Sequence, residues 1–136
     1  MIASGEVPAS LVYEDEKAVA FLDLNPRARG HTLVIPKRHA ATFTDLSEED
    51  VGKLFAAVRT VAARLMQELG AAGVNIGVNS GEVAGQVVPH LHVHVLPRYT
   101  GEEPKGFESA FKVSEELKKR VETAPKGLID NLSLWI

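Results

Sequence analysis

The sequence predicts an α+β fold in which short strands form a mainly antiparallel sheet beside one long helix. Two observations carry this prediction. Apolar residues recur at helical spacing over one long internal stretch, and short runs rich in Val, Ile and Leu lie on both sides of it. The chain has 136 residues, enough to bury a core without disulfides or structural metal, and we therefore expect a single domain.

The N-terminal part of the chain is expected to form a hairpin and a third strand. The apolar runs at 11–13 and 18–22 flank the polar segment Glu14-Asp15-Glu16-Lys17, which is typical of two strands joined by a turn. The segment 25–30 contains Pro and Gly and reads as a loop. Strand-forming residues resume at 31–35.

A long amphipathic helix is expected in the middle of the chain. Ser47, with Asp50 three residues later, forms an acidic variant of the capping box, and Gly70 supplies the stop. The apolar positions between these signals recur at helical spacing. They are Val51, Leu54, Phe55, Val58, Ala62, Leu65 and Leu69.

Two further strands and a short helix complete the expected fold. Residues 74–78 and 90–96 read as the fourth and fifth strands. After a polar connection, Ser114 starts a short helix that contains Leu117 and Val121. The prediction is a five-stranded, mainly antiparallel sheet with one long helix and a short C-terminal helix.

Three of the five histidines alternate with apolar residues in the last expected strand. Successive side chains of a strand point to opposite faces, so His90, His92 and His94 share one face. Neighbours on that face lie about 6.8 Å apart, which gives His92 an imidazole on each side. Two of these imidazoles could bind one metal ion, but the outer pair starts about 13 Å apart, which disfavours a site of all three. The row is better suited to catalysis, with His92 as a central nucleophile and an assisting imidazole on each side. Neutral imidazole attacks phosphorus well near pH 7. The side chains expected to face the core are Leu91, Val93 and Val95.

The run from His90 to Leu96 reads His-φ-His-φ-His-φ-φ, where φ is apolar. Further segments that match one known family are Phe21 to Leu24, Gly30 to Lys37, Asn79 and Gly85-Gln86. Together they resemble the histidine triad (HIT) family of nucleotide hydrolases and transferases, closest in kind to its prokaryotic Hint-like members. The resemblance implies a single HIT domain over 1–136, with a core at about 6–98 and a C-terminal extension at about 99–136.

The resemblance also implies a reaction in two steps. An imidazole nitrogen of His92 attacks the α-phosphorus of a nucleoside 5′-monophosphate derivative, and water then cleaves the nucleotidyl-histidine. His94, His90 and His31 would steady the phosphate, and a backbone carbonyl would fix the second ring nitrogen of His92. A purine nucleoside phosphoramidate is the expected substrate, and no cofactor is expected. A dinucleoside polyphosphate hydrolase and a catalytically weak nucleotide-binding interaction protein remain as alternatives.

The substrate-binding residues are also implied by the resemblance. Asp23 would accept both ribose hydroxyls, and Phe21 or Leu24 would contact the base. The residues expected near the phosphates or leaving group are Asn79, Gly85, Gln86, Val87 and Val88. Each has a plainer interpretation as well: Asp23 as a turn residue, Phe21 and Leu24 as core, and Gly85 as a loop position with positive φ. His31 could likewise cap a loop, and His39 is expected at the surface.

The sequence departs from the family pattern in three places. Val87 stands where phosphoramidase members often have Ser and polyphosphate hydrolases often have Thr, and valine donates no hydrogen bond. Residues 1–8 look like a shortened N-terminal element, so part of the base pocket is expected to be missing. Some relatives bind zinc through N-terminal cysteines, whereas this chain has no Cys. A structural zinc is therefore not expected.

The charge and the apolar patterning of the sequence exclude several classes of binding partner. The formal net charge of −3 argues against broad binding to nucleic acid. No apolar run approaches the roughly 20 residues of a membrane span, and no secretory signal is seen, so we expect a cytoplasmic protein without a membrane partner.

The expected ligand is a purine nucleotide or nucleotide conjugate. A metal-dependent hydrolase that combines the histidine row with Asp23 is a further alternative.

A homodimer is expected. The resemblance implies that the long helix and the strand at 74–78 meet their symmetry mates, and pairing would remove an exposed strand edge. The C-terminal tail is too apolar to remain exposed to solvent. We expect it to pack either on its own subunit or on the partner. In the second case Trp135 would lie near the partner's leaving-group pocket. The apolar residues of the tail are Leu128, Ile129, Leu132, Leu134, Trp135 and Ile136.

Overall fold

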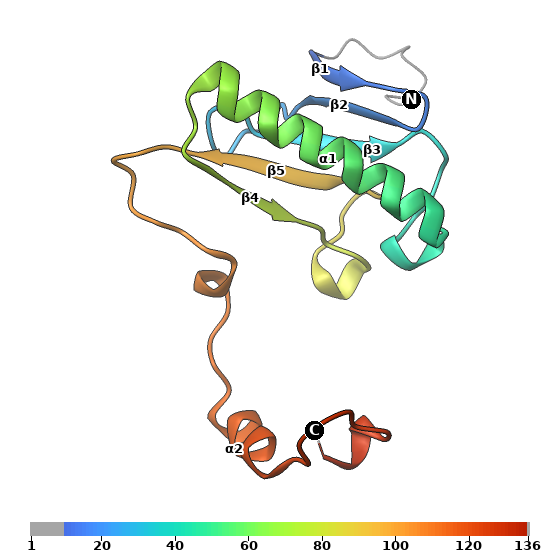
Figure 1. Ribbon diagram of the computed structural model, residues 1–136, viewed down its shortest axis with the longest axis vertical. Coiled ribbons are helices and arrows are strands. Elements are labelled where there is room, and N and C mark those ends of the chain that lie inside the picture. The colour runs from blue at the N-terminus through green and yellow to red at the C-terminus, as the bar shows by residue number, and fades with distance from the viewer. Residues whose placement is uncertain (1–9, 136) are drawn as a thin grey trace. The chain divides into compact units, whose positions relative to one another are not determined.

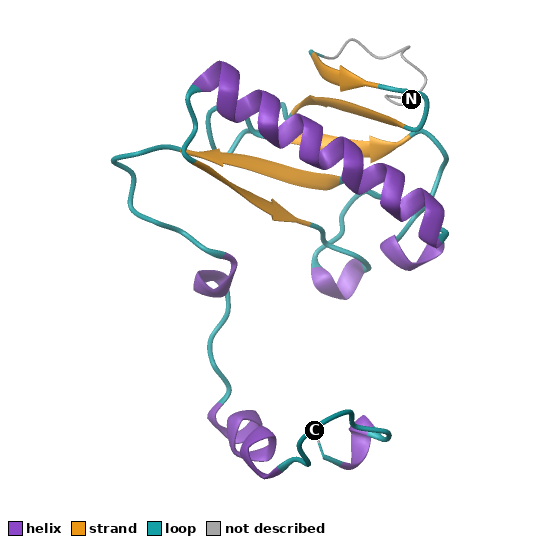
Figure 2. Cartoon of the chain, in the orientation of Figure 1, coloured by secondary structure: helices purple, strands orange, loops and turns teal. Residues whose placement is uncertain are grey.

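The computed structural model describes residues 10–135 and divides the chain into two compact units, Met1–Pro104 and Lys105–Ile136. The first unit holds five strands and one long helix, and the second holds a short helix (Figures 1 and 2). In chain order these elements are β1 (Leu11–Glu14), β2 (Ala18–Leu22), β3 (Thr32–Pro36), α1 (Glu48–Leu69), β4 (Gly73–Gly77), β5 (Val93–Arg98) and α2 (Glu115–Thr123).

The five strands form one sheet in the order β1-β2-β3-β5-β4, and all neighbours are antiparallel. The predicted α+β class with a five-stranded antiparallel sheet is confirmed. The bounds of β1 to β4 differ from the predicted ones by at most one residue at either end. The largest difference is at β5, which begins at Val93 and not at His90.

The late start of β5 has a local cause. The backbone N–H of His90 donates to the Val88 carbonyl at 2.8 Å, and that of Leu91 donates to the Ala40 carbonyl at 2.7 Å. These bonds tie the segment to nearby loops and not to the β3 or β4 ladder. The predicted alternation nevertheless holds, because Leu91, Val93 and Val95 are fully buried and the three histidines between and beside them are half-buried.

Helix α1 covers one face of the sheet (Figure 1). As predicted, it is bounded by Ser47, whose hydroxyl accepts the Asp50 N–H at 3.1 Å, and by Gly70, which adopts φ +73°. Its apolar stripe packs against strand residues that point to the same side, including Ala20 and Val34. The buried stripe comprises Leu54, Ala57, Val58, Val61, Ala62 and Leu65.

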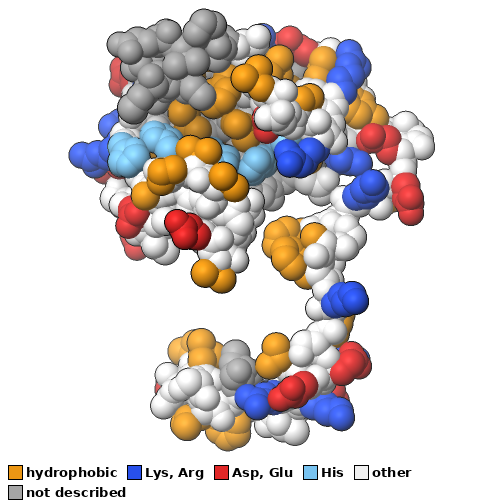
Figure 3. Space-filling view, turned by 180° about the vertical axis from the view of Figure 1, so that it is seen from behind, with side chains coloured by type: hydrophobic (Ala, Val, Ile, Leu, Met, Phe, Trp, Pro, Cys, Tyr) orange, Lys and Arg blue, Asp and Glu red, His pale blue; other side chains and the backbone are white. Residues whose placement is uncertain are grey.

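The opposite face of the sheet carries the histidines. Strand register aligns Phe21 of β2, Leu33 of β3, His94 of β5 and Gly77 of β4 in one row across it. Phe21 belongs to a second, smaller apolar cluster with Val19 and Ile35 on this face. Figure 3, seen from behind the view of Figure 1, shows histidine side chains gathered here with hydrophobic side chains beside them. The fold therefore places imidazoles and an apolar surface side by side.

The second unit contains the predicted short helix. Ser114 caps α2 by accepting the Leu117 N–H at 3.2 Å. Many apolar side chains of this unit are exposed, among them Leu117, Val121, Leu132 and Trp135. Within residues 10–135, no helix combines the length and the apolar character needed to cross a membrane.

Candidate active site

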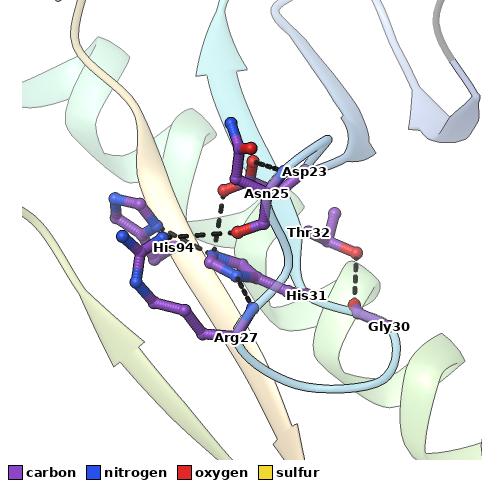
Figure 4. Close-up of polar contacts among 7 residues, drawn as sticks. All are labelled: Asp23, Asn25, Arg27, Gly30, His31, Thr32 and His94. Atoms are coloured by element: carbon purple, nitrogen blue, oxygen red, sulfur yellow. Dashed lines mark hydrogen bonds and ion pairs between the residues drawn. The ribbon is translucent and has the colours of Figure 1, made fainter.

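Three side chains from different elements meet beside the end of β2. Asp23 follows β2, His31 directly precedes β3, and His94 lies in β5 (Figure 4). Nε2 of His31 is 2.9 Å from Nδ1 of His94 and 3.4 Å from Oδ2 of Asp23. His31 is almost fully buried, and the Asp23 side chain is 13% exposed. Sequence reasoning named all three residues but gave no contact between His31 and His94.

Backbone contacts fix the proton positions in this group. The backbone N–H of Arg27 points at Nδ1 of His31 at 3.1 Å, and because an amide N–H only donates, this Nδ1 must accept. A neutral His31 then carries its proton on Nε2 and donates it to Nδ1 of His94. By the same reasoning His94 carries its proton on Nε2. The result is an imidazole N–H that is free to donate to a ligand.

Both imidazoles are held in the neutral form. Burial lowers the pKa of His31 and of His94 below the usual histidine range. The neighbouring imidazoles of His92 and His31 lower the pKa of His94 further, while Asp23 partly opposes the shift at both histidines. Near neutral pH, these residues therefore act as hydrogen-bond donors and acceptors and supply no fixed positive charge.

His92 is oriented for nucleophilic attack. Its Nδ1 is 2.8 Å from the carbonyl oxygen of His90, so Nδ1 carries the proton and Nε2 keeps a free lone pair. This contact agrees with the expected backbone carbonyl. The rings of His92 and His94 are in contact, with centroids 5.1 Å apart. A nucleophilic nitrogen and an N–H donor thus lie side by side.

His90 contacts residues that the sequence did not predict as its partners. Its Nδ1 is 3.0 Å from Nδ1 of His39, and its Nε2 is 3.4 Å from the Pro36 carbonyl oxygen. Among the described residues, His92 therefore has ring contact with His94, and its Nδ1–H donates to the backbone carbonyl of His90. The exposure expected for His39 is confirmed, but its contact with His90 was missed. These two residues are 51 positions apart, and no local pattern joins them.

The loop before the histidines is held by one buried amide. Gln86 is 8% exposed, its Oε1 accepts the Gly81 N–H at 2.8 Å, and its Nε2 donates to the carbonyls of Ala41 and Val88 at 2.5 and 3.0 Å. Both N–H donors and one acceptor position of this amide are thus used within the protein. Gln86 was expected near the phosphates, and its contacts give it the role of a brace that sets the path of the chain leading to His90.

The other residues expected at the phosphates lie around this loop. Gly85 adopts φ +97°, as expected, and a Cβ placed on it would be 3.9 Å from the Asn79 side chain. Asn79 is exposed, Val87 is 91% exposed and Val88 is exposed as well. None of these side chains forms part of the core of the described domain, so all remain accessible to a ligand.

Substitution of Gln86 tests the brace. Gln86→Glu keeps the acceptor for Gly81 but replaces the NH₂ group by an oxygen that faces two carbonyls. We expect the free energy of unfolding to fall by about 1–3 kcal/mol, the cost of leaving buried polar groups unsatisfied. Thermal or urea unfolding measures this loss, with Glu82→Gln in the same exposed turn as the matched control. Equal stability of both variants and the parent protein would contradict the bracing role.

The residues expected at the base and ribose differ in exposure. Phe21 is 6% exposed, whereas Leu24 is 91% exposed. Oδ1 of Asp23 accepts the Asn25 N–H at 2.9 Å, which is the turn role considered above, while Oδ2 faces His31. Asp23 also lines a cavity of about 480 Å³ together with Leu22 and residues 26–31. A ligand therefore has space directly beside the carboxylate and His31.

The chain is similar to known proteins over most of its length. The family model of the HIT domain matches residues 4–101. An uncharacterized HIT-like protein of Methanocaldococcus jannaschii is 46% identical over 101 residues, which cover 74% of this chain and 78% of that protein. The protein hit of Bacillus subtilis is 43% identical over 98 residues, covering 72% and 68%. This fold carries a row of alternating histidines. Together with the sequence similarities, that row defines one class of protein.

Solved structures agree with the sequence matches. A zinc-bound histidine triad family protein from Mycobacterium smegmatis has a TM-score of 0.71 at 43% identity and covers 76% of each chain. A hypothetical histidine triad nucleotide-binding protein from Sulfolobus tokodaii has a TM-score of 0.71 at 38% identity, with 84% of this chain and 74% of that chain covered. The chain belongs to the HIT family.

The zinc of the mycobacterial relative raises the question of a metal site. Ligand atoms of Asp23, His31 and His94 lie within 4.8 Å of one another. A metal on Nε2 of His31 would move the ring proton to Nδ1, where it would oppose the Arg27 N–H. Between residues 10 and 135, no third His, Asp or Glu joins the His39–His90 pair to form a metal-binding group. Neither arrangement fits zinc.

Proposed function

We propose that the protein is a hydrolase that transfers a nucleotidyl group through His92. Nε2 of His92 forms a bond to the α-phosphorus, and the bond from phosphorus to the leaving group breaks. Water then attacks the same phosphorus and releases the nucleoside monophosphate and the imidazole. The observation that carries this proposal is the 2.8 Å contact from Nδ1 of His92 to the His90 carbonyl, which leaves Nε2 unprotonated.

His94 would stabilise the charge that develops on the phosphoryl oxygens. Its Nε2–H is available because Nδ1 accepts the proton of His31. A donor that is oriented before the reaction needs no reorganisation in the transition state, which is why such donors accelerate phosphoryl transfer. His31 acts through His94, because its Nε2–H donates to Nδ1 and so holds the His94 tautomer.

The proposed substrate is a nucleotide. The row from Phe21 through Leu33 to His94 crosses three strands spaced about 4.8 Å apart, a span on the scale of a nucleoside monophosphate. The base would lie toward Phe21 and the α-phosphate at His92 and His94. The Sulfolobus relative is named a nucleotide-binding protein, which supports the same substrate class.

The leaving group is tested with a substrate panel. A purine nucleoside phosphoramidate is the proposed substrate, and a dinucleoside polyphosphate is the second candidate because Val87, 91% exposed beside the site, offers the leaving group no proton. We expect the phosphoramidate to give the highest kcat/KM among phosphoramidate, dinucleoside polyphosphate, nucleotidyl sulfate and sugar nucleotide. A higher value for the polyphosphate would establish the second candidate, and binding without turnover of any compound would establish a non-catalytic binder.

We also propose that the protein is a homodimer. Among the described strands, β4 lies at the edge of the sheet with β5 as its one neighbour, and Ile76 in it is 45% exposed. Sedimentation or light scattering at micromolar concentration should give twice the chain mass.

Truncation after Lys126 should loosen this dimer or alter substrate preference if the apolar tail crosses to the partner. A monomeric mass would contradict the dimer, and an unchanged dimer and substrate profile after truncation would contradict the crossing alone.

A further inference from the structure

Arg27 is anchored at the site, yet its charge is unpaired. Its backbone N–H donates to Nδ1 of the buried His31, which fixes this residue against the imidazole group. Its guanidinium makes one long hydrogen bond, 3.4 Å from Nη1 to the Asn25 carbonyl oxygen. Throughout residues 10–135, no carboxylate lies within ion-pair distance of it. Figure 4 shows the Arg27 side chain running past His31 toward His94.

The charge of Arg27 reaches the imidazoles. Burial lowers the pKa of His31 and of His94, and the positive charge of Arg27 lowers both further. Figure 3 likewise shows positively charged side chains next to the histidines on this face. A fixed cation therefore lies close to the His94 N–H, in a group whose histidines are neutral.

The other nearby cations are engaged elsewhere. Arg29, two residues along the same loop, lies over the Tyr99 ring with its Cζ 5.9 Å from the centroid. The Tyr99 hydroxyl in turn donates to the Arg29 carbonyl at 2.7 Å. Lys37 pairs with Glu14 at 2.7 Å, and Arg38 pairs with Asp50 at 3.3 Å. Of these four side chains, Arg27 is the one whose charge contacts neither a carboxylate nor an aromatic ring among residues 10–135.

We propose that the guanidinium of Arg27 binds a non-bridging oxygen of the substrate α-phosphate and supplies a fixed positive charge beside His94. This role rests on the proposed function, because it requires the phosphate to lie at His92 and His94. The planar guanidinium donates charge-assisted hydrogen bonds to phosphate oxygens, and such bonds are stronger than neutral ones. Arg27 would thus determine the preference of the site for a phosphorylated ligand over a nucleoside.

Ligand binding tests this role without any turnover. Affinities for AMP and for adenosine are measured by calorimetry with the parent protein, Arg27→Gln, Arg27→Lys and the control Arg59→Gln, an exposed position of α1 away from the histidines. We expect Arg27→Gln to weaken AMP binding about tenfold, as loss of one charge-assisted hydrogen bond implies, with adenosine unchanged. Arg27→Lys should recover part of the loss, and Arg59→Gln should bind both ligands like the parent. The difference between AMP and adenosine should shrink at high salt in the parent protein.

Two other outcomes would overturn the role. Unchanged AMP affinity in Arg27→Gln would show that the guanidinium does not contact phosphate, and equal losses for AMP and adenosine would show a purely structural effect. Histidine titration by NMR gives a second readout, because Arg27→Gln should raise the pKa of His94 whereas Arg59→Gln should not. A protein that fails to form a nucleotidyl-histidine but shows the AMP-specific loss would refute the covalent mechanism and leave the Arg27 assignment intact.

Discussion

His92→Asn is expected to reduce kcat by roughly three orders of magnitude or more while the affinity for a mononucleotide changes little. The Asn amide can still donate to the His90 carbonyl, so the substitution removes the Nε2 lone pair and keeps the contact that orders this segment. Single-turnover kinetics and AMP binding measure the two effects separately. Parent-like turnover in this variant would rule out His92 as the nucleophile.

His90→Asn and His94→Asn are the controls for this experiment, and we expect smaller losses of kcat for both. His90 contributes its backbone carbonyl to His92, and that carbonyl is retained when the side chain is replaced. His94 contributes an N–H donor but forms no bond to phosphorus in the proposed reaction. An equal loss in all three variants would indicate general damage to the site.

Asp23→Asn is expected to weaken binding of a ribonucleotide by about 1.5–3 kcal/mol, the range for hydrogen bonds to a charged group. The carboxylate would accept the two ribose hydroxyls, and an amide offers half the acceptors and two donors in their place. The measurement is a binding titration with AMP and with its 2′,3′-dideoxy analogue, using the parent protein and the variant.

The dideoxy analogue separates ribose recognition from structural effects. Asp23 also accepts the Asn25 N–H and lies 3.4 Å from His31, so the substitution disturbs the protein as well as the ligand contact. That disturbance should weaken both ligands alike, whereas loss of the ribose contact should weaken AMP alone. Equal losses for both ligands would show that Asp23 does not bind the ribose.

The parts of this fold that the sequence predicts are those encoded by local signals. Ser47 and Gly70 mark the ends of α1 through backbone chemistry that acts within one turn. The alternation from Leu91 to Val95 marks which side chains face the core, and burial confirms it. The five-stranded antiparallel sheet follows from the number of strands and the single long helix, together with the resemblance to the HIT family.

The contacts that sequence reasoning missed join residues far apart in the chain. The pairs His31 with His94, His39 with His90 and Gln86 with Ala41 are brought together by sheet register and loop path. Residue spacing along the sequence does not predict contacts between such distant residues. The same loop path explains why β5 starts at Val93 and not at the predicted His90, since the His90 and Leu91 N–H groups bond to loop carbonyls. Arg27 carried no motif, and its position was found only from its contact with His31.

The covalent intermediate on His92 is the central claim, and trapping it is the most direct measurement. The protein is mixed with a purine nucleoside phosphoramidate, quenched in alkali within a fraction of a turnover because histidine N–P bonds hydrolyse in acid, digested and analysed by mass spectrometry. We predict that the peptide containing His92 gains one nucleoside monophosphate group, that fragmentation places it on His92, and that it decays as product accumulates. Turnover of the same substrate without any adduct, or with the adduct on another residue, would contradict the mechanism.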